Sequence, residues 1–592
     1  MENKSRKSQS LLNGALVLSL STIIVKIIGV IYKIPLTNMI GTIGRGYFDS
    51  AYSLYVPIYT ISMAGLPVAV SKMVSQEMAL GHYRDVKLIH KVSKRLFLMM
   101  GIIGTLLILL LTYPYALSVK TTAVIPSLLI IGPSILFCCI MSIYRGYYNG
   151  LRNMTPTAIS QVLEALGKLV FGIVCSKAVI TYGYSRFNAG LSVFGQVVQN
   201  ETEALSRIYP YAAAGATAGV TLGTVVGMIF LVILGKFKGD GITKTELATA
   251  PRPVKSSVIS GRLVRFSIPV ILSSLVFGIT NIIDAVTIQN RLDHVVAGNL
   301  PFMRQLYSAE LQGVLDADVK GFLYGAYSLS VDFKNLIPSI TLTLGVSAIP
   351  ALSAAWAMRD RRQIRTSIES VLRVTMLVAM PCGIGMAVLA QPILAIFYGG
   401  GTAASSISIA APVMSAYGAT IFLIALSQPM TNMLQAIDKT RIPLVSLSIG
   451  AIVKVIANFI LVAIPKINVN GAVIGTIICY IIIDSINLFA LLKFTRTRIN
   501  FISVFVKPSF CGILCGLGAY TTFAVCNRFI PEFAVSGHSL KAIICLGLSV
   551  AIGGIVYIIS MLFVKGIAKD DVIMLPKGEK IAKILAKYGF IG

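Results

Sequence analysis

The chain has 592 residues, of which 56% are hydrophobic and only 12% are charged. A water-soluble domain carries about 25% charged residues, so this chain has too few polar side chains to cover a soluble globule. The formal net charge is +28, which basic cytoplasmic loops facing anionic headgroups explain without a nucleic-acid partner.

Fourteen apolar stretches follow one another along the chain, and each reaches the roughly 20 residues that a helix needs to cross a bilayer. In chain order they cover residues 12–38, 48–71, 96–116, 122–146, 155–180, 208–235, 263–289, 322–352, 370–397, 405–436, 443–464, 470–493, 503–527 and 540–564. The sequence therefore predicts an all-α polytopic membrane protein with about 14 transmembrane helices.

Lysine and arginine placement predicts the orientation of these spans. An even number of spans puts both termini on one side, and the segments on that side hold most of the basic residues. The strongest contributors are residues 236–265, 359–373 and 565–587. Because basic loops remain in the cytoplasm, both termini are predicted to be cytoplasmic.

The chain also contains an internal repeat. The motif AYSL begins at Ala51 and again at Ala326, an offset of 275, and a later match pairs the surroundings of Lys168 with those of Lys454. The repeat divides the first twelve spans into two six-helix lobes, expected to be related by a pseudo-two-fold axis along the membrane normal. The predicted organisation is an N-lobe over 1–236, a basic cytoplasmic linker over 237–262, a C-lobe over 263–494, and a final helix pair with a cytoplasmic tail over 495–592.

No pattern in the sequence is typical of an enzyme or a metal centre. The four histidines lie in loops or at loop edges, the nine cysteines lie in or beside apolar spans, and no GxxxxGK loop precedes a helix. We therefore predict no catalytic residues, no metal site and no cofactor. A protein of two similar membrane halves is typically a transporter, with its site near the bilayer midplane.

Charged residues within the spans are the best candidates for that site, because a charge at bilayer depth costs a few kcal/mol and usually faces a cavity. Lys26 and Lys33 are two helical turns apart and share one face of the first span, as binding of an anion would require. The alternative for Lys33 is that it extends to the outer headgroups. Lys334 is expected to face the cavity as well, on the opposite side of its helix from Asp332.

Glu164 and Lys168 are four residues apart, the spacing of an ion pair within one helix, and this pairing is the favoured interpretation. Lys454 occupies the place of Lys168 in the second half and has no matching glutamate, so at least one of these lysines needs another partner. Tyr52 and Tyr327, one in each AYSL motif, either line a wall that contacts sugar or lipid or pack between helices.

Two further groups of residues are candidates for coupling and movement. Asp284, Asp484 and Glu164 are candidate sites for a coupling sodium ion or proton, although interhelical hydrogen bonding is the favoured role of the two aspartates. Pro57 and Pro338 lie near the midpoints of corresponding spans and are either hinges or static kinks.

The segments TIIVKIIGVIYKIPLTNMIG and AGLPVAVSKMVSQE resemble the multidrug/oligosaccharidyl-lipid/polysaccharide exporter superfamily. Within it the resemblance is to the polysaccharide-transporter branch, which includes stage V sporulation protein B-like proteins and lipid II flippases of the MurJ type. It covers essentially the whole chain. It implies that the protein moves an undecaprenyl-diphosphate-linked glycan from the inner to the outer leaflet of the bacterial plasma membrane by alternating access.

The resemblance also implies roles for particular residues. First-helix arginines of the lipid II flippases are thought to meet the diphosphate, and Lys26 falls on the first such position, while Tyr32 falls on the second with Lys33 beside it. Lys334 approximately matches an arginine of the eighth helix. The arginine expected in the second helix is missing, and spans thirteen and fourteen match the pair thought to guide the lipid tail. Replacing arginine by lysine loses a planar two-pronged donor, which weakens the case for lipid II over a related glycan.

The expected function is therefore flipping of a lipid-linked oligosaccharide, most plausibly the peptidoglycan precursor lipid II, with roles in cell-wall synthesis and cell shape. The expected partners are membrane lipids and cell-wall synthesis enzymes. The alternatives are a flippase for another surface polysaccharide or a teichoic-acid precursor, and a cation-coupled drug exporter on the same fold. A membrane glycosyltransferase would need carboxylates on a sizeable outer loop, and residues 290–320 offer only four acidic side chains. This enzyme and a non-transporting assembly scaffold for cell-wall enzymes are the least favoured alternatives.

Overall fold

The computed structural model describes residues 11–237, 239–531, 534–535 and 538–567. This part of the chain is almost wholly helical, with a single short hairpin of strands, and every predicted span falls on helix. Eleven of the helices that the structure describes are long and apolar enough to cross a membrane. The helical membrane fold is thus confirmed, while the count of 14 spans and the symmetry of the lobes stay predictions.

The chain divides into two compact units, described here one at a time. Unit 1 comprises Met1–Asn290 and Gly313–Gly325, and unit 2 comprises Arg291–Gln312 and Ala326–Gly592. The predicted linker over 237–262 therefore lies within unit 1. The elements of unit 1 are α1 (Leu11–Ala79), α2 (Tyr83–Ser118), η1 (Thr122–Val124), α3 (Ile125–Ile131), α4 (Ser134–Gly150), α5 (Thr155–Asn188), α6 (Glu201–Phe237), α7 (Lys244–Thr249), the greater part of α8 (Ser256–Leu306), η2 (Asp316–Asp318) and the start of α9 (Val319–Lys334).

The first two predicted spans form one long helix. α1 runs from Leu11 to Ala79 and keeps its course across residues 39–47, which sequence analysis left between spans. Its one non-helical residue is Gly41, at φ 67° and ψ 176°, a conformation that a residue with a Cβ avoids. The helix is therefore kinked at Gly41 but not interrupted by a loop.

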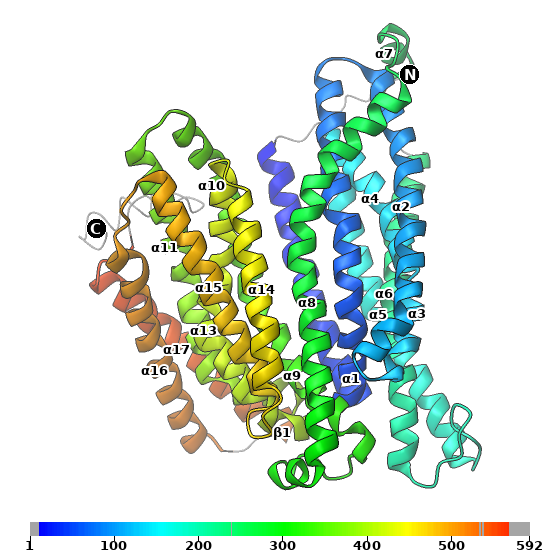
Figure 1. Cartoon of the computed structure of the whole chain (residues 1–592), viewed down its shortest axis with the longest axis vertical. Coiled ribbons are helices and arrows are strands. Elements are labelled where there is room, and N and C mark those ends of the chain that lie inside the picture. Colours follow the sequence, from blue (N-terminus) through cyan, green and yellow to red (C-terminus); the bar gives the residue numbers. More distant parts are fainter. Residues whose placement is uncertain (1–10, 238, 532–533, 536–537, 568–592) are drawn as a thin grey trace. The chain divides into compact units, whose positions relative to one another are not determined.

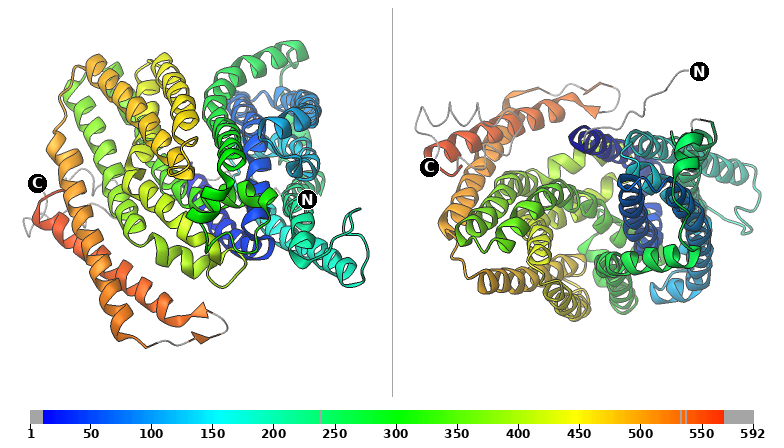
Figure 2. Two further views of the ribbon diagram at one scale, coloured as in Figure 1. Left: turned by 60° about the horizontal axis from the view of Figure 1, so that its bottom comes forward. Right: turned by 90° about the horizontal axis from the view of Figure 1, so that it is seen from above.

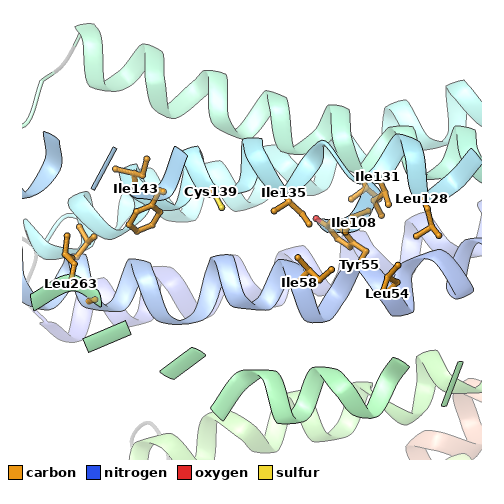
Figure 3. Close-up of a cluster of buried hydrophobic side chains, with 14 of the residues drawn as sticks. Leu54, Tyr55, Ile58, Ile108, Leu128, Ile131, Ile135, Cys139, Ile143 and Leu263 are labelled. Atoms are coloured by element: carbon orange, nitrogen blue, oxygen red, sulfur yellow. The ribbon is translucent and has the colours of Figure 1, made fainter. Parts of the chain in front are cut away.

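The core of unit 1 forms where α1 packs against α2, α3 and α4, which run beside it in Figure 1. Leu54, Tyr55 and Ile58 project from α1 towards Ile108 of α2 and Ile135 of α4 (Figure 3). All five side chains are buried. In a bilayer this close packing, rather than exclusion from water, holds helices together.

Within unit 1, the residues just before the two AYSL motifs contact each other through glycine. A methyl group at Gly46 would lie 2.9 Å from the carbonyl oxygen of Gly321, and one at Gly325 would overlap the carbonyl oxygen of Thr42. The backbones of α1 and α9 therefore cross at a distance that only glycine permits. Close by, the Tyr47 hydroxyl donates a hydrogen bond to Asp318 at 3.4 Å.

The segment after α6 is bound to the ends of α2 and α4. The Asp240 carboxylate forms an ion pair with Lys87 of α2 and accepts a hydrogen bond from the Tyr147 hydroxyl of α4. Further hydrogen bonds join Arg84 to the carbonyls of Leu247 and Ala248, and the Val254 amide to Asp85. Farther along, Gln289 of α8 donates to Ser50 of α1 at 2.9 Å, so α8 begins as part of unit 1.

Unit 2 is a second helical bundle. Its elements are the remainders of α8 and α9, then α10 (Leu336–Ala357), α11 (Arg361–Val388), α12 (Ala390–Tyr398), η3 (Ala404–Ser406), α13 (Ile407–Ala436), α14 (Arg441–Leu461), α15 (Val469–Thr495), the π-helical turn η4 (Ile502–Val506), α16 (Lys507–Phe529), β1 (Ala534–Val535), β2 (His538–Ser539) and α17 (Leu540–Phe563). α13 packs against α10, α11 and α15, and α14 pairs with α15. α16 and α17 form a hairpin at the edge of the unit, against α11 (Figure 2).

Replacing Gly325 with alanine tests the glycine crossing. The added methyl group must push α9 away from Thr42 of α1, so we expect a lower thermal unfolding temperature in detergent, with a loss of about 1–3 kcal/mol. Gly385→Ala is the matched control, because nothing lies within 4 Å of the position its methyl group would take. Equal unfolding temperatures for the two variants would contradict the crossing.

Replacing Asp240 with asparagine tests the attachment of the linker. Burial alone would raise the pKa of the Asp240 carboxyl, but hydrogen bonds from Lys87 and Tyr147 lower it overall, so the group is ionised at neutral pH. Removing the charge should speed backbone amide exchange over residues 239–255 by about fivefold, as expected for loss of roughly 1 kcal/mol. Exchange that is unchanged, or altered equally by the exposed control Asp438→Asn, would show that the ion pair does not hold the linker.

Candidate functional site

The strongest candidate site in unit 1 is a lysine that rests on two tyrosine rings. The Lys168 ammonium, near the middle of α5, lies 4.8 Å from the ring centre of Tyr52 and 5.4 Å from that of Tyr32. Its Nζ also lies 3.3 Å from the Tyr52 hydroxyl oxygen. Lys168, Tyr32 and Tyr52 are called the Lys168 cluster below. Ring faces stabilise the ammonium group without neutralising its charge.

Close helix packing fixes the tyrosines of this cluster. Tyr32 is buried, and its hydroxyl donates to the Ala216 carbonyl of α6 at 3.1 Å. A methyl group at Gly172 of α5 would lie 2.6 Å from that hydroxyl oxygen, so the ring occupies the space that glycine leaves. Tyr52 is only half-buried, which leaves one side of the cluster accessible.

The predicted ion pair between Glu164 and Lys168 is not formed. Glu164 instead pairs with Arg145 of α4, whose guanidinium nitrogen lies 2.9 Å from the carboxylate. Arg145 also donates to the Ser160 hydroxyl at 2.9 Å. The prediction considered neighbours on one helix, whereas the buried arginine comes from another helix and offers a planar, multiple donor.

Tyr52 belongs to a row of aromatic side chains on one face of α1. The ring centres of Phe48, Tyr52, Tyr55 and Tyr59 follow one another at 5.6, 5.5 and 5.4 Å. Their spacing of three or four residues places them on the same helix face. Phe48 and Tyr55 are buried, whereas Tyr52 between them is only half-buried and is therefore more accessible to a ligand than either.

The first-helix lysines lie on a less enclosed part of α1. The side chain of Lys26 is exposed and that of Lys33 is half-buried. Lys26 is close enough to both Lys33 and Tyr52 for electrostatic interaction. Both lysines can therefore add positive charge beside the Lys168 cluster, while their direct contact with substrate stays a prediction.

Unit 2 contains a second pairing of lysine with tyrosine. Lys334, at the end of α9, is buried, and its ammonium lies 4.9 Å from the ring centre of Tyr417 of α13. The Tyr417 and Tyr327 hydroxyl oxygens are 2.9 Å apart and share a hydrogen bond. Tyr327 thus packs between helices, whereas its repeat partner Tyr52 meets a lysine directly. Lys334, Tyr417 and Tyr327 are called the Lys334 cluster.

A group of buried polar residues occupies the contact of α13, α14 and α15. Asp484 is 7% exposed, and neither carboxylate oxygen has a hydrogen-bond partner among the described residues. The Ser427 hydroxyl faces it from α13 but lies outside hydrogen-bond geometry. The Asn487 carbonyl accepts from Ser446 of α14 at 2.7 Å, so the expected interhelical bond forms at Asn487 and not at Asp484. Asp484, Ser427 and Asn487 are called the Asp484 cluster.

The other predicted residues lie outside these clusters. Lys454 is buried within α14, in contrast to the half-buried Lys168, and Asp284 is half-buried on α8. Pro57 is buried on α1 against Gly278 of α8, within unit 1, and Pro338 lies one turn after Lys334 on α10. Whether either proline is a hinge stays a prediction.

One group of side chains has the donor types of a metal site. The ligand atoms of Glu77, His82 and Asp85 lie within 4.8 Å of one another. Their atoms are already engaged, because Glu77 pairs with His82 at 2.8 Å and with Arg262 at 3.7 Å, and Asp85 accepts from the linker. The positive charge of the Arg262 guanidinium disfavours binding of a metal cation at this place. The three side chains and Arg262 instead link the ends of α1, α2 and α8.

Sequence analysis did not identify two buried arginines of unit 1. Arg145 lies at the edge of a predicted span, a position usual for a cytoplasmic charge, yet it is buried where α4 packs against the neighbouring helices of unit 1. Arg45 lies in the gap between the first two predicted spans, yet it is fully buried and pairs with Asp49 at 2.5 Å. Arg45 and Asp49 are four residues apart, so a helix that continues through residues 39–47 would have predicted their ion pair.

Comparisons with known proteins agree with this architecture. Residues 11–199 match the family described as polysaccharide biosynthesis protein, and residues 326–536 match the family described as lipid II flippase MurJ. The lipid II flippase MurJ of Bacillus subtilis is 24% identical over 93% of this chain and 95% of its own length. Stage V sporulation protein B of the same organism is 23% identical over 96% of this chain and 98% of its own length.

Solved structures show the same fold. A structure of lipid II flippase MurJ in an inward closed conformation superposes with a TM-score of 0.62 and 14% identity, over 93% of this chain and 98% of that one. An inward-facing multidrug resistance MATE family transporter also gives a TM-score of 0.62, over 82% of this chain and 98% of that one. The two family models and these relatives support the resemblance to the multidrug/oligosaccharidyl-lipid/polysaccharide exporter superfamily, in the polysaccharide-transporter branch with the MurJ-type proteins, and the solved structures show that the chain has the same fold.

Proposed function

We propose that this protein flips a polyprenyl-diphosphate-linked glycan from the inner to the outer leaflet of the bacterial plasma membrane by alternating access. The observation that carries the proposal is the Lys168 cluster. There an ammonium group within a membrane helix rests on tyrosine rings, while the carboxylate one turn away is paired with Arg145. The lysine therefore keeps a positive charge for an anionic ligand.

The chemistry of such a substrate fits this arrangement. A diphosphate attached to sugars cannot enter hydrocarbon without a compensating charge. Lys168 and Lys26 can supply that charge through short charge-assisted hydrogen bonds, and the half-buried face of Tyr52 can pack against a sugar ring. An ammonium group released from an aromatic face loses about 0.5–2 kcal/mol, which a phosphate contact readily offsets.

The lipid part of the substrate can remain in the bilayer. The α16–α17 hairpin presents apolar side chains that are about half exposed, including Ile513, Leu517 and Ile555. This surface supports contact with an acyl or polyprenyl chain, as the resemblance implies for the last helix pair. An inside-negative potential would favour outward movement of the anion by about 2.3 kcal/mol per charge per 100 mV.

Lipid II is the glycan that we favour, because relatives named for it match along nearly the whole chain. Stage V sporulation protein B is almost equally similar, so a related carrier-linked glycan, such as a teichoic-acid precursor, is the main alternative. Lys26 and Lys334, which the resemblance matches to arginines of the lipid II flippases, favour a looser contact with diphosphate than bidentate pairing would give. Cell-wall synthesis enzymes are the partners expected for either substrate.

We further propose that the Asp484 cluster binds the coupling ion, a sodium ion or a proton. A buried carboxyl group without a hydrogen-bond partner is costly in an apolar bundle and becomes stable once it takes up a cation or a proton. The neighbouring oxygens of Ser427 and Asn487 are ligands of the type that a hard cation prefers. Glu164 is a weaker candidate because it is already paired with Arg145. Asp284 is a weaker candidate because it is only half-buried, so its charge costs less than that of Asp484.

Lysine variants in proteoliposomes test the flippase proposal. With a fluorescent lipid-linked disaccharide as substrate, Lys168→Met and Lys26→Met should each slow flipping by roughly tenfold, since a hydrogen bond to a charged group contributes about 1.5–3 kcal/mol. Lys177→Met is the matched control, because this lysine lies on the exposed side of the same helix as Lys168. Flipping that is unchanged in both variants would remove the proposed anion contacts, and efflux of a cationic drug instead would favour the exporter alternative.

Ion dependence tests the Asp484 cluster. If it binds sodium, purified wild-type protein should unfold at a higher temperature in sodium chloride than in choline chloride, because a ligand that binds only the folded state stabilises it. If it binds a proton, flipping should instead vary with pH at constant salt. Asp484→Asn should abolish whichever dependence the wild type shows. A wild type insensitive to both sodium and pH would exclude the coupling role.

A further inference from the structure

Arg145 makes two contacts to the same face of α5. Its Nε donates to the Ser160 hydroxyl and a terminal nitrogen to the Glu164 carboxylate, both at 2.9 Å. Ser160 and Glu164 are four residues apart and therefore neighbours on that face. The guanidinium is 4% exposed, so its position is set by packing as well as by these hydrogen bonds.

The ion pair with Arg145 keeps Glu164 from pairing with Lys168. Glu164 and Lys168 are also four residues apart, with the glutamate on the N-terminal side, which is the better orientation for an ion pair within a helix. Without Arg145 the carboxylate would be a partly buried charge one turn from an ammonium group, and pairing with Lys168 would be its nearest compensation. The observed structure instead leaves Lys168 on the rings of Tyr32 and Tyr52.

The second half of the chain supports this link between the three residues. Lys454 corresponds to Lys168 at an offset of 286, which places Gly450 at the position of Glu164, and residues 428–431, which match the surroundings of Arg145, contain no arginine. The acid and the arginine are thus present together in the first half and missing together in the second. This is the pattern expected if the arginine is needed because the acid is there.

We propose that Arg145 is a positioning residue, which holds Glu164 away from Lys168 and so keeps the ammonium group available for the anionic part of the substrate. The inference rests on the proposed function, because it assigns Arg145 to the same site. Arg145 itself does not touch the substrate. With the pair intact, the three residues carry one net positive charge at Lys168, and without Arg145 they carry none.

The decisive experiment compares single and double variants for flipping of a fluorescent lipid-linked disaccharide in proteoliposomes. Arg145→Met should raise KM by about tenfold with a smaller change in kcat, because an i,i+4 ion pair to Glu164 would occupy Lys168. Arg145→Met/Glu164→Gln should restore KM to within about threefold of the wild type, since no carboxylate remains to capture the lysine. Arg145→Lys, which keeps the charge, should retain most of the wild-type affinity.

This rescue separates positioning from a structural role, because the double variant lacks Arg145 as well. Arg361→Met is the control for loss of an exposed arginine, and Glu164→Gln alone is the reference for the double variant. If Arg145→Met does not fold, Ser160→Ala can be used instead, because it removes one of the two hydrogen bonds that hold Arg145. This variant should raise KM by about twofold, and adding Glu164→Gln should return KM to the wild-type value. Equal impairment of the variants with and without Glu164 would overturn the inference.

The two proposals can fail separately in this experiment. If Lys168→Met flips the substrate as fast as the wild type, Lys168 does not contact the anion, and the proposed function loses its main support. If Lys168→Met is impaired but the double variant is no better than Arg145→Met, the anion contact stands and only the role of Arg145 is wrong.

Discussion

The cost of an unpaired charge inside a bilayer-spanning bundle governs the arrangement of both units. Two arginines of unit 1 take carboxylates, in the pairs of Arg45 with Asp49 and Arg145 with Glu164, whereas the buried carboxyl of Asp484 in unit 2 has no hydrogen-bond partner among the described residues. Lys168 and Lys334 lie on tyrosine faces instead. Breaking a buried pair is costly, but a ring face binds an ammonium group weakly and releases it to a better ligand. The difference separates structural charges from those that can serve a substrate.

The helical fold could be predicted from the sequence because hydropathy is a local property. Each apolar stretch reaches the length of a span by itself, so every predicted span falls on helix. The prediction was less accurate where a polar stretch stays in a helix. Residues 39–47 contain Arg45 and three glycines, a composition typical of a loop, yet α1 runs through them because Asp49 and Thr37 satisfy the guanidinium.

Much less of the candidate site could be predicted, because charge pairing depends on helices that are distant in sequence. Spacing correctly drew attention to Lys168 and Glu164 but joined them to each other, since the burial of Arg145 is invisible without the packing of α4 on α5. The repeat identified Tyr52 and Tyr327 together, although one contacts a lysine and the other shares a hydrogen bond with Tyr417. Similar sequence fixes the place of a residue on its helix, while the neighbouring helices decide its partner.

The divergence between the halves has a physical consequence for transport. In unit 1 the ionic groups beside the Lys168 cluster leave one positive charge with an accessible side, as an anion requires. In unit 2 the Asp484 carboxyl is enclosed among neutral hydroxyl and amide groups, an environment that suits a small cation or a proton and excludes a bulky glycan. Under these two proposals, the two units separate two binding tasks by charge and by size. An ion-driven flippase couples such tasks through a change of conformation, because ion binding and substrate binding each favour one of two states.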